Sequence, residues 1–201
     1  MADTEKAIAD VFQQVWSEYA GRISIDGGSK VLVSDANAAN AIYKATESVR
    51  TPYGPEITVA RRGVQGEEES RLPDKAKYKN VDSLDFDHYS HAIFGIASED
   101  PKFIMQGLKA MITAMRPKGV AVVISLKTES GQTGEDGQVS VSLEDKMQYQ
   151  SKGKISKLTD VMEYAGFEKG KIRTFDKSTE ASGKKVDAEV VLAMKWDQLS
   201  A

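Results

Sequence analysis

The chain has 201 residues, of which 40% are hydrophobic and 28% are charged, with a net charge of -3 and no cysteine. This length suits one globular domain with a substantial core. The lack of cysteine excludes disulfides, thiol nucleophiles and thiolate metal ligands. The weakly negative charge argues against nucleic-acid and membrane-surface partners.

The start of the chain has no signal-peptide pattern. Asp3 and Glu5 stand where a signal peptide carries positive charge, and no apolar run approaches the length of a membrane span. We therefore expect a cytoplasmic protein without a membrane partner.

Residues 1–28 predict an N-terminal helical segment. Apolar side chains recur at helical spacing between residues 3 and 20, which places them on one face of a helix that packs against a sheet. Two glycines then break the chain. The apolar face consists of Ile8, Val11, Phe12, Val15, Trp16 and Tyr19.

A strand, a helix and a second strand are predicted next. Residues 30–34 form a short apolar run typical of a buried strand. Residues 36–49 have the pattern of a helix, with Ser34 or Asp35 as its N-cap. A stretch rich in proline and glycine ends this helix, and residues 56–60 predict the second strand.

The middle of the chain predicts a long loop followed by a regular strand and helix. Residues 61–79 are polar and irregular, which is typical of a surface loop, and a short third strand is expected at residues 78–81. Residues 89–96 predict the fourth strand and residues 101–115 an amphipathic helix. Residues 120–126 form the clearest buried strand of the chain.

The last third predicts an insertion, a helix and a hairpin. Residues 128–150 are rich in glycine, serine, threonine and acids, which indicates a flexible insertion with an edge strand at residues 138–142. Residues 154–164 predict a helix that ends at a glycine. Residues 171–175 and 188–196 predict an antiparallel pair of strands.

This alternation of strands and helices, ending in a hairpin, predicts an α/β three-layer sandwich with a mostly parallel sheet. The pattern shows no internal repeat and no second hydrophobic unit. We therefore expect residues 1–201 to form a single domain.

The order of these elements and three local stretches resemble the class I S-adenosylmethionine-dependent methyltransferases. Residues 82–95 resemble the family's acidic turn and fourth strand, and residues 115–123 its proline turn into the fifth strand, with Lys118 in place of a glycine. Residues 157–167 resemble its helix ending in Ala-Gly-Phe. The resemblance implies a Rossmann-like, seven-stranded sheet with an antiparallel last strand.

The resemblance also implies where S-adenosylmethionine would bind. The family's glycine motif after the first strand falls on residues that carry side chains, and its ribose-binding acid after the second strand falls on Ala60 and Arg61. Glycine serves at such a turn because the backbone approaches the ligand with no side chain in between. If the cofactor binds, its contacts are expected to be Asp35, Asn37, Ala39, Asp82, Ser83 and Ile96.

Several of these residues also have a structural interpretation. Asp35 either accepts hydrogen bonds from the cofactor's amino group or caps the following helix, and Asp82 either lies beside adenine or closes a turn. Arg61 and Arg62 either face a phosphate of another nucleotide or pair with neighbouring glutamates in solvent. General preferences favour the structural interpretation in each case.

His88 and His91 are the two histidines of the chain and the first candidates for a general base. On one strand, residues three positions apart point to opposite faces, which argues against a shared metal site. We therefore expect no metal. The alternative is that each histidine has a structural role.

Two functions of different classes remain. In the first, a methyltransferase-like protein with a degraded cofactor site binds no cofactor and is an interaction or regulatory module, whose protein partner is an active methyltransferase or a second copy. In the second, the chain is an active methyltransferase that acts on a small molecule or a protein. A third reading, a binder of another nucleotide through Arg61 and Arg62, lacks a glycine-rich turn as well.

Overall fold

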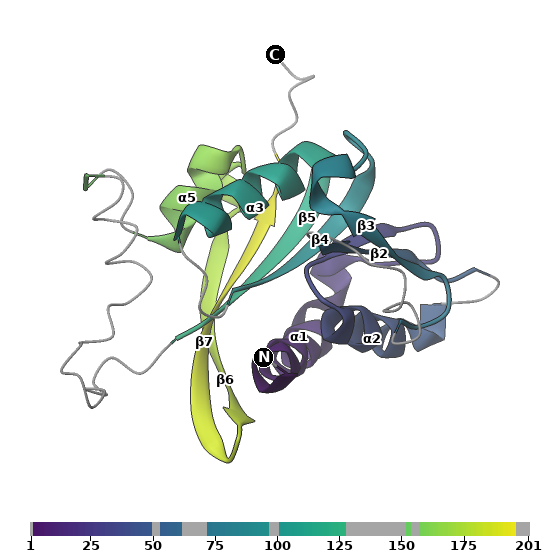
Figure 1. Cartoon of the computed structure of the whole chain (residues 1–201), viewed down its shortest axis with the longest axis horizontal. Helices are drawn as coiled ribbons and strands as arrows, with labels where there is room; N and C mark the ends of the chain where they lie inside the picture. Colours follow the sequence, from purple (N-terminus) through teal and green to yellow (C-terminus); the bar gives the residue numbers. More distant parts are fainter. Residues whose placement is uncertain are drawn as a thin grey trace.

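The computed structural model describes residues 2–49, 53–61, 72–96, 101–127, 152–153 and 157–195. These residues form a seven-stranded sheet in the order β3-β2-β1-β4-β5-β7-β6 (Figure 1). The strands are β1 (Lys30–Val33), β2 (Glu56–Arg61), β3 (Ala76–Asn80), β4 (Tyr89–Ile96), β5 (Met115–Leu126), β6 (Arg173–Ala181) and β7 (Lys184–Met194).

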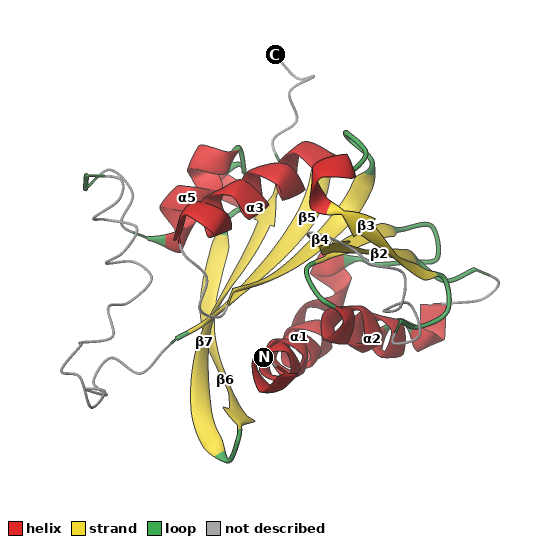
Figure 2. Cartoon of the chain, in the orientation of Figure 1, coloured by secondary structure: helices red, strands yellow, loops and turns green. Residues whose placement is uncertain are grey.

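Helices cover both faces of this sheet and give the molecule three layers (Figure 2). One face packs against α1 and α2, and the other packs against α3 and α5, with a separate apolar core on each side. No helix in the described ranges is long and apolar enough to cross a membrane. The helices are α1 (Ala2–Ile23), α2 (Ala36–Ala45), α3 (Pro101–Ala114) and α5 (Leu158–Ala165), with 3-10 turns η1 (Glu47–Val49), η3 (Val81–Ser83) and η4 (Lys169–Lys171).

The strand directions confirm the predicted fold class. β3, β2, β1, β4 and β5 pair in parallel, and β7 lies antiparallel between β5 and β6. A parallel pair needs a crossover, and here α2 and α3 supply the crossovers that follow β1 and β4. The result is the Rossmann-like, mostly parallel sheet with an antiparallel last strand.

The C-terminal hairpin is longer than the sequence pattern predicts. The strands expected at residues 171–175 and 188–196 extend toward each other until Ala181 pairs with Lys184. Ser182 and Gly183 form the turn, and both have positive φ angles, 52° and 74°. A two-residue turn of this kind matches the natural twist of two antiparallel strands, so pairing continues to the tip.

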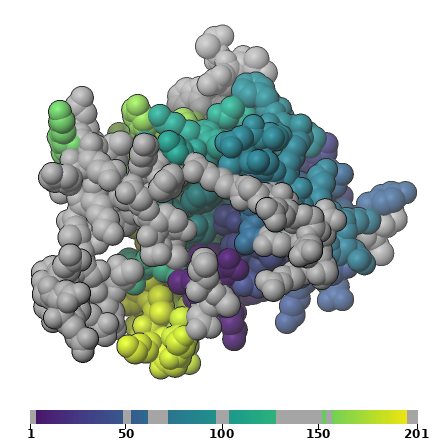
Figure 3. All heavy atoms as spheres, viewed as in Figure 1, coloured from purple at the N-terminus to yellow at the C-terminus, as the bar shows by residue number. Residues whose placement is uncertain are grey.

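The first helix packs against strand β6 of the hairpin, although the two elements are far apart in the sequence (Figure 1, Figure 3). The Tyr19 ring stacks on the Phe175 ring with 4.8 Å between centroids. Gln14 Nε2 donates to the Ser178 carbonyl oxygen at 3.0 Å, and Lys177 forms an ion pair with Glu18. The face of β6 that points toward α1 is therefore covered.

Three other boundaries differ from the predicted ones. β3 lies inside the expected loop and ends at Asn80, before η3 begins. α2 ends at Ala45, and buried Thr46 caps it by bonding the Ile42 carbonyl with its backbone N–H at 2.9 Å and with its hydroxyl at 2.8 Å. α5 begins at Leu158, and residues 154–156 of the predicted helix lie outside the described residues. The expected insertion at residues 128–150 and its edge strand lie outside the described residues.

The backbone conformation at the start of β5 requires glycine at position 119. Lys118, which stands in place of a family glycine, has a φ angle of 63°. At the next residue, a Cβ on Gly119 would lie 2.9 Å from the Arg116 carbonyl oxygen and 3.2 Å from that of Ser90. Backbone atoms cannot move aside cheaply, so this position has room only for glycine.

We expect Gly119→Ala to lower the free energy of unfolding by about 1 to 3 kcal/mol, because the added methyl group overlaps two carbonyl oxygens. Urea unfolding followed by circular dichroism measures the change. Gly170→Ala is the matched control, since a Cβ there meets nothing within 4 Å. Equal stability of the two variants would contradict the steric explanation.

Candidate functional site

The turn between β1 and α2 is two residues long and is tied to the neighbouring strand β4. Ser34 donates its backbone N–H to the Ile93 carbonyl oxygen at 3.1 Å. Its Oγ accepts from the Gly95 N–H at 2.9 Å and donates to Asp35 Oδ2 at 3.2 Å. The Ser34 hydroxyl therefore has its one donor and one of its two acceptor lone pairs bonded inside the protein.

Asp35 caps α2, as one of the two predicted N-caps. Its Oδ1 accepts from the Ala38 N–H at 2.7 Å, and its carbonyl oxygen accepts from the Ala39 N–H at 3.2 Å. Two N–H groups of the first helical turn are thus bonded to Asp35. In a nucleotide-binding turn such donors face the ligand.

Burial raises the pKa of the Asp35 carboxyl group above its ordinary value. Desolvation is the largest effect, since the residue is only 8% exposed. The hydrogen bonds from Ala38 and Ser34 lower the pKa, and the nearby charge of Glu5 raises it further. The desolvation effect exceeds that of the cap.

The other two residues of the degenerate glycine motif face α1. Asn37 donates from Nδ2 to Glu5 Oε2 at 3.3 Å, and Ala39 is completely buried in the core on the α1 side. α1 approaches closely because Gly95 lacks a side chain, since a Cβ there would lie 2.7 Å from Ile8 Cδ1. The N-terminal half of α1 therefore packs over the ends of β1 and β4.

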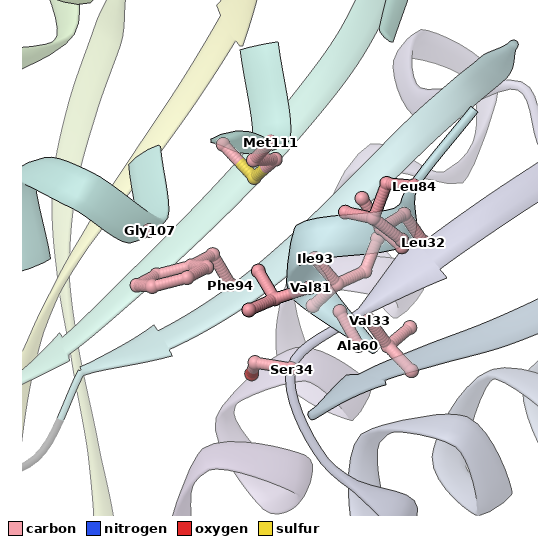
Figure 4. Close-up of a pocket in the computed structure, with 10 residues that line it drawn as sticks. All are labelled: Leu32, Val33, Ser34, Ala60, Val81, Leu84, Ile93, Phe94, Gly107 and Met111. Carbon is pink, nitrogen blue, oxygen red and sulfur yellow. The ribbon is translucent and has the colours of Figure 1, made fainter. Parts of the chain in front are cut away.

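A small cavity, partly open to solvent, lies on the opposite face of the sheet, between η3, α3 and the carboxyl ends of β1, β2 and β4 (Figure 4). The strand order reverses between β1 and β4, and ligands of open α/β sheets bind at such a switch point. The described residues that line the cavity are Leu32, Val33, Ser34, Ala60, Val81, Leu84, Ile93, Phe94, Gly107 and Met111.

The lining is apolar. Ser34 supplies its one polar side chain among the described residues, and that hydroxyl is already bonded on both sides. Asp82 and Ser83, predicted to contact a cofactor, are exposed on η3, and Ile96 is buried in the core against α3. None of these three is among the described lining residues, although Val81 of the same turn is.

At the end of β2, the structure separates the two residues that the sequence pattern places near a ribose. Ala60 lines the cavity, whereas Arg61 lies over the Tyr78 ring of β3 at 5.5 Å from its centroid. Arg62 lies outside the described residues.

The two histidines lie at the amino end of β4, at the other edge of the sheet from the cavity. His88 donates its backbone N–H to the carbonyl oxygen of Ala114, the last residue of α3, at 2.8 Å. His91 is buried, with Nε2 2.6 Å from the Ile23 carbonyl oxygen and Nδ1 2.8 Å from Ser90 Oγ. Burial lowers the pKa of His91, so the neutral ring links the end of α1 to the sheet.

The structure thus brings none of the predicted site residues together around the cavity. Its lining includes residues that the sequence analysis did not single out, of which Gly107 carried a signal. An isolated glycine inside a helix usually has a packing reason. Here a Cβ would lie 2.8 Å from Phe94 Cζ, so glycine lets the Phe94 ring lie against α3.

Among the described residues, no group of three or more histidine, aspartate or glutamate side chains is placed to hold a metal ion.

No known family model and no curated protein matches the chain in sequence. Solved structures do match. A 1,6-didemethyltoxoflavin-N1-methyltransferase from Burkholderia thailandensis, solved with S-adenosylhomocysteine, has a TM-score of 0.59 and 14% identity, covering 96% of this chain and 80% of its own. A putative sarcosine dimethylglycine methyltransferase from Galdieria sulphuraria has a TM-score of 0.58 and 13% identity, covering 92% and 86%.

A third match is to SpnF, a [4+2]-cyclase, with a TM-score of 0.53 and 14% identity, covering 92% of this chain and 80% of its own. The chain therefore has the class I methyltransferase-like fold. Identities this low establish the fold and leave the activity to be argued from the site.

The Asp35 cap predicts a stability that depends on pH. Asp35→Ala removes the cap and should lower the free energy of unfolding by about 0.5 to 2 kcal/mol. Asp35→Asn keeps a capping oxygen but cannot ionise. Because the pKa of Asp35 is raised in the folded state, protonation favours folding, and this contribution is lost as the pH rises through the folded pKa.

The wild-type protein should therefore gain stability relative to Asp35→Asn as the pH falls from neutral toward the ordinary pKa of aspartate. Urea unfolding of both proteins over that pH range measures the difference. A difference that shrinks or stays constant on acidification would show that the carboxylate is not destabilised by burial.

Proposed function

We propose that this protein is a non-catalytic interaction or regulatory module that has the methyltransferase fold and does not bind S-adenosylmethionine in the usual way. One observation carries the proposal. The carboxylate of Asp35 occupies the N–H groups at the start of α2, where this type of fold offers donors to a ligand.

A ligand that carries negative charge would meet a second obstacle at this turn. The buried Asp35 carboxylate repels it, and the Glu5 carboxylate lies beside Asn37 on the same side. Moving Asp35 out of the way would leave buried N–H groups unpaired, at a cost of about 1 to 3 kcal/mol each. About 1.4 kcal/mol corresponds to a tenfold loss of affinity.

The cavity offers no compensating polar contacts from the described side chains. A nucleoside needs partners for its ribose hydroxyls, and the β2 position that lines the cavity is Ala60. The neighbouring Arg61 lies over Tyr78. These features support a fold that is kept for its shape and surface.

The outer edge of β6 supports a protein partner. In the described part of the sheet β6 is the last strand. Gln14 of α1 bonds to the Ser178 carbonyl oxygen, and the other outward backbone groups have no strand beside them. An extended segment of another protein can add to such an edge. We propose that an active methyltransferase or another protein binds there.

Several registers of self-association through this edge bring like charges together, although Lys177 is paired with Glu18 and Asp176 with Lys127. In a symmetric antiparallel pair of two β6 strands, odd-numbered residues lie opposite odd-numbered ones and even-numbered residues opposite even-numbered ones. If the pair is centred on Lys177 or on Asp176, that residue lies opposite the same residue of the second copy. A pair centred on Phe175 places Arg173 opposite Lys177, and a pair centred on Ser178 places Asp176 opposite Glu180. Like charges directly opposite are destabilising.

Isothermal titration calorimetry with S-adenosylmethionine and S-adenosylhomocysteine tests the cofactor prediction. We expect no heat of binding for either ligand with folded protein, because the donors of α2 are already used. The chain carrying Asp35→Gly, Asn37→Gly and Ala39→Gly together is the matched variant, in which the turn regains the family's glycines. Stoichiometric binding by the parent chain would overturn the proposal in favour of an active methyltransferase.

The edge prediction has a separate test. We expect the isolated chain to sediment as a monomer of 22.0 kDa, since edge-to-edge pairing brings like charges together. A dimer in which residues 173–181 become protected from hydrogen exchange would contradict it and make a second copy the partner.

A further inference from the structure

We propose that the cavity at the switch point binds a small, uncharged, apolar ligand. The inference rests on the proposed function in one respect, namely that no cofactor occupies this end of the sheet. It adds a ligand class that the likeness to methyltransferases does not supply.

The walls of the cavity come from five elements, and the side chains that they contribute are mainly hydrocarbon. Figure 4 shows the side chain of Val81 between those of Phe94 and Ile93, with Met111 on the opposite side from Ser34. An aromatic ring, a thioether and branched aliphatic groups suit apolar molecules, and small-molecule sites are lined mainly by such groups.

The shape of the cavity depends on Gly107. With no Cβ on that residue, the Phe94 ring lies against α3, where a methyl group would come within 2.8 Å of it. The cavity is narrow and partly open to solvent, so a bound molecule would place one small apolar group against these walls.

The polar groups beside the cavity disfavour a charged ligand. The Ser34 hydroxyl cannot donate to a ligand without giving up its bond to Asp35, and Asp35 places a carboxylate next to it. An anion would be repelled, and any charged group would lose its hydration without a partner among the described lining side chains. Apolar cavities, by contrast, take up neutral hydrocarbons readily.

The test uses N-phenyl-1-naphthylamine, a neutral aromatic probe whose fluorescence rises in apolar surroundings. We expect saturable binding of one probe per chain. Val81→Asp places a carboxylate on the half-buried wall of the cavity and should weaken binding at least tenfold. The matched control is Ser83→Asp, which adds the same charge at an exposed position of η3 and should leave binding unchanged.

A second variant covers the case in which Val81→Asp fails to fold. Ala60→Leu fills the cavity with hydrocarbon from the end of β2 and should also weaken binding at least tenfold. Equal weakening by Val81→Asp and Ser83→Asp, or no effect of Ala60→Leu, would overturn the inference because the probe would then bind elsewhere. So would the absence of saturable binding to the wild-type chain.

Competition separates this inference from the proposed function. Displacement of the probe by S-adenosylhomocysteine would overturn both, because the cavity would then hold the cofactor. If neither the probe nor S-adenosylhomocysteine binds, the apolar ligand is refuted while the proposed function stands. Probe binding that S-adenosylhomocysteine leaves unchanged is the expected result.

Discussion

The hydrogen bonds of the two-residue turn after β1 constrain everything around the candidate site. Ser34 joins the turn to β4, and Asp35 joins it to the first turn of α2. Because the helix begins immediately after this turn, its N–H groups have to be satisfied from within, and a carboxylate does so at the cost of its own burial. The position of α1 follows, since Asn37 and Gly95 provide the surface on which its N-terminal half packs.

The strand order of the sheet and the side chains at its switch point are separate features of the molecule. The strand order that creates a crevice at the switch point is present, and the crevice is lined by hydrocarbon. Among the described lining residues none carries a charged side chain, and the Asp35 carboxylate beside the crevice is bonded to the first turn of α2. The fold alone therefore does not determine the chemistry of the crevice.

The sequence predicts the layers and most of the strands because hydrophobic periodicity reports burial, and it predicts the Asp35 cap because the residue stands just before a helical pattern. The hairpin tip was missed, since Ser182 and Gly183 lie among polar residues with weak alternation. The cavity could not be predicted, because Phe94, Gly107 and Val81 are brought together only by packing. For the same reason the hydrogen bonds of His91 to Ile23 and Ser90 could not be predicted from the sequence pattern.

The contact between α1 and β6 has a consequence for the order in which the chain can fold during synthesis. Gln14 and Ser178, which it brings together, are 164 residues apart, and the stacked pair Tyr19 and Phe175 is almost as distant. On the ribosome α1 emerges long before the strand that covers its far side. The aromatic face of α1 therefore stays uncovered until β6 has been synthesised, and during that delay its apolar surface is open to association with other chains.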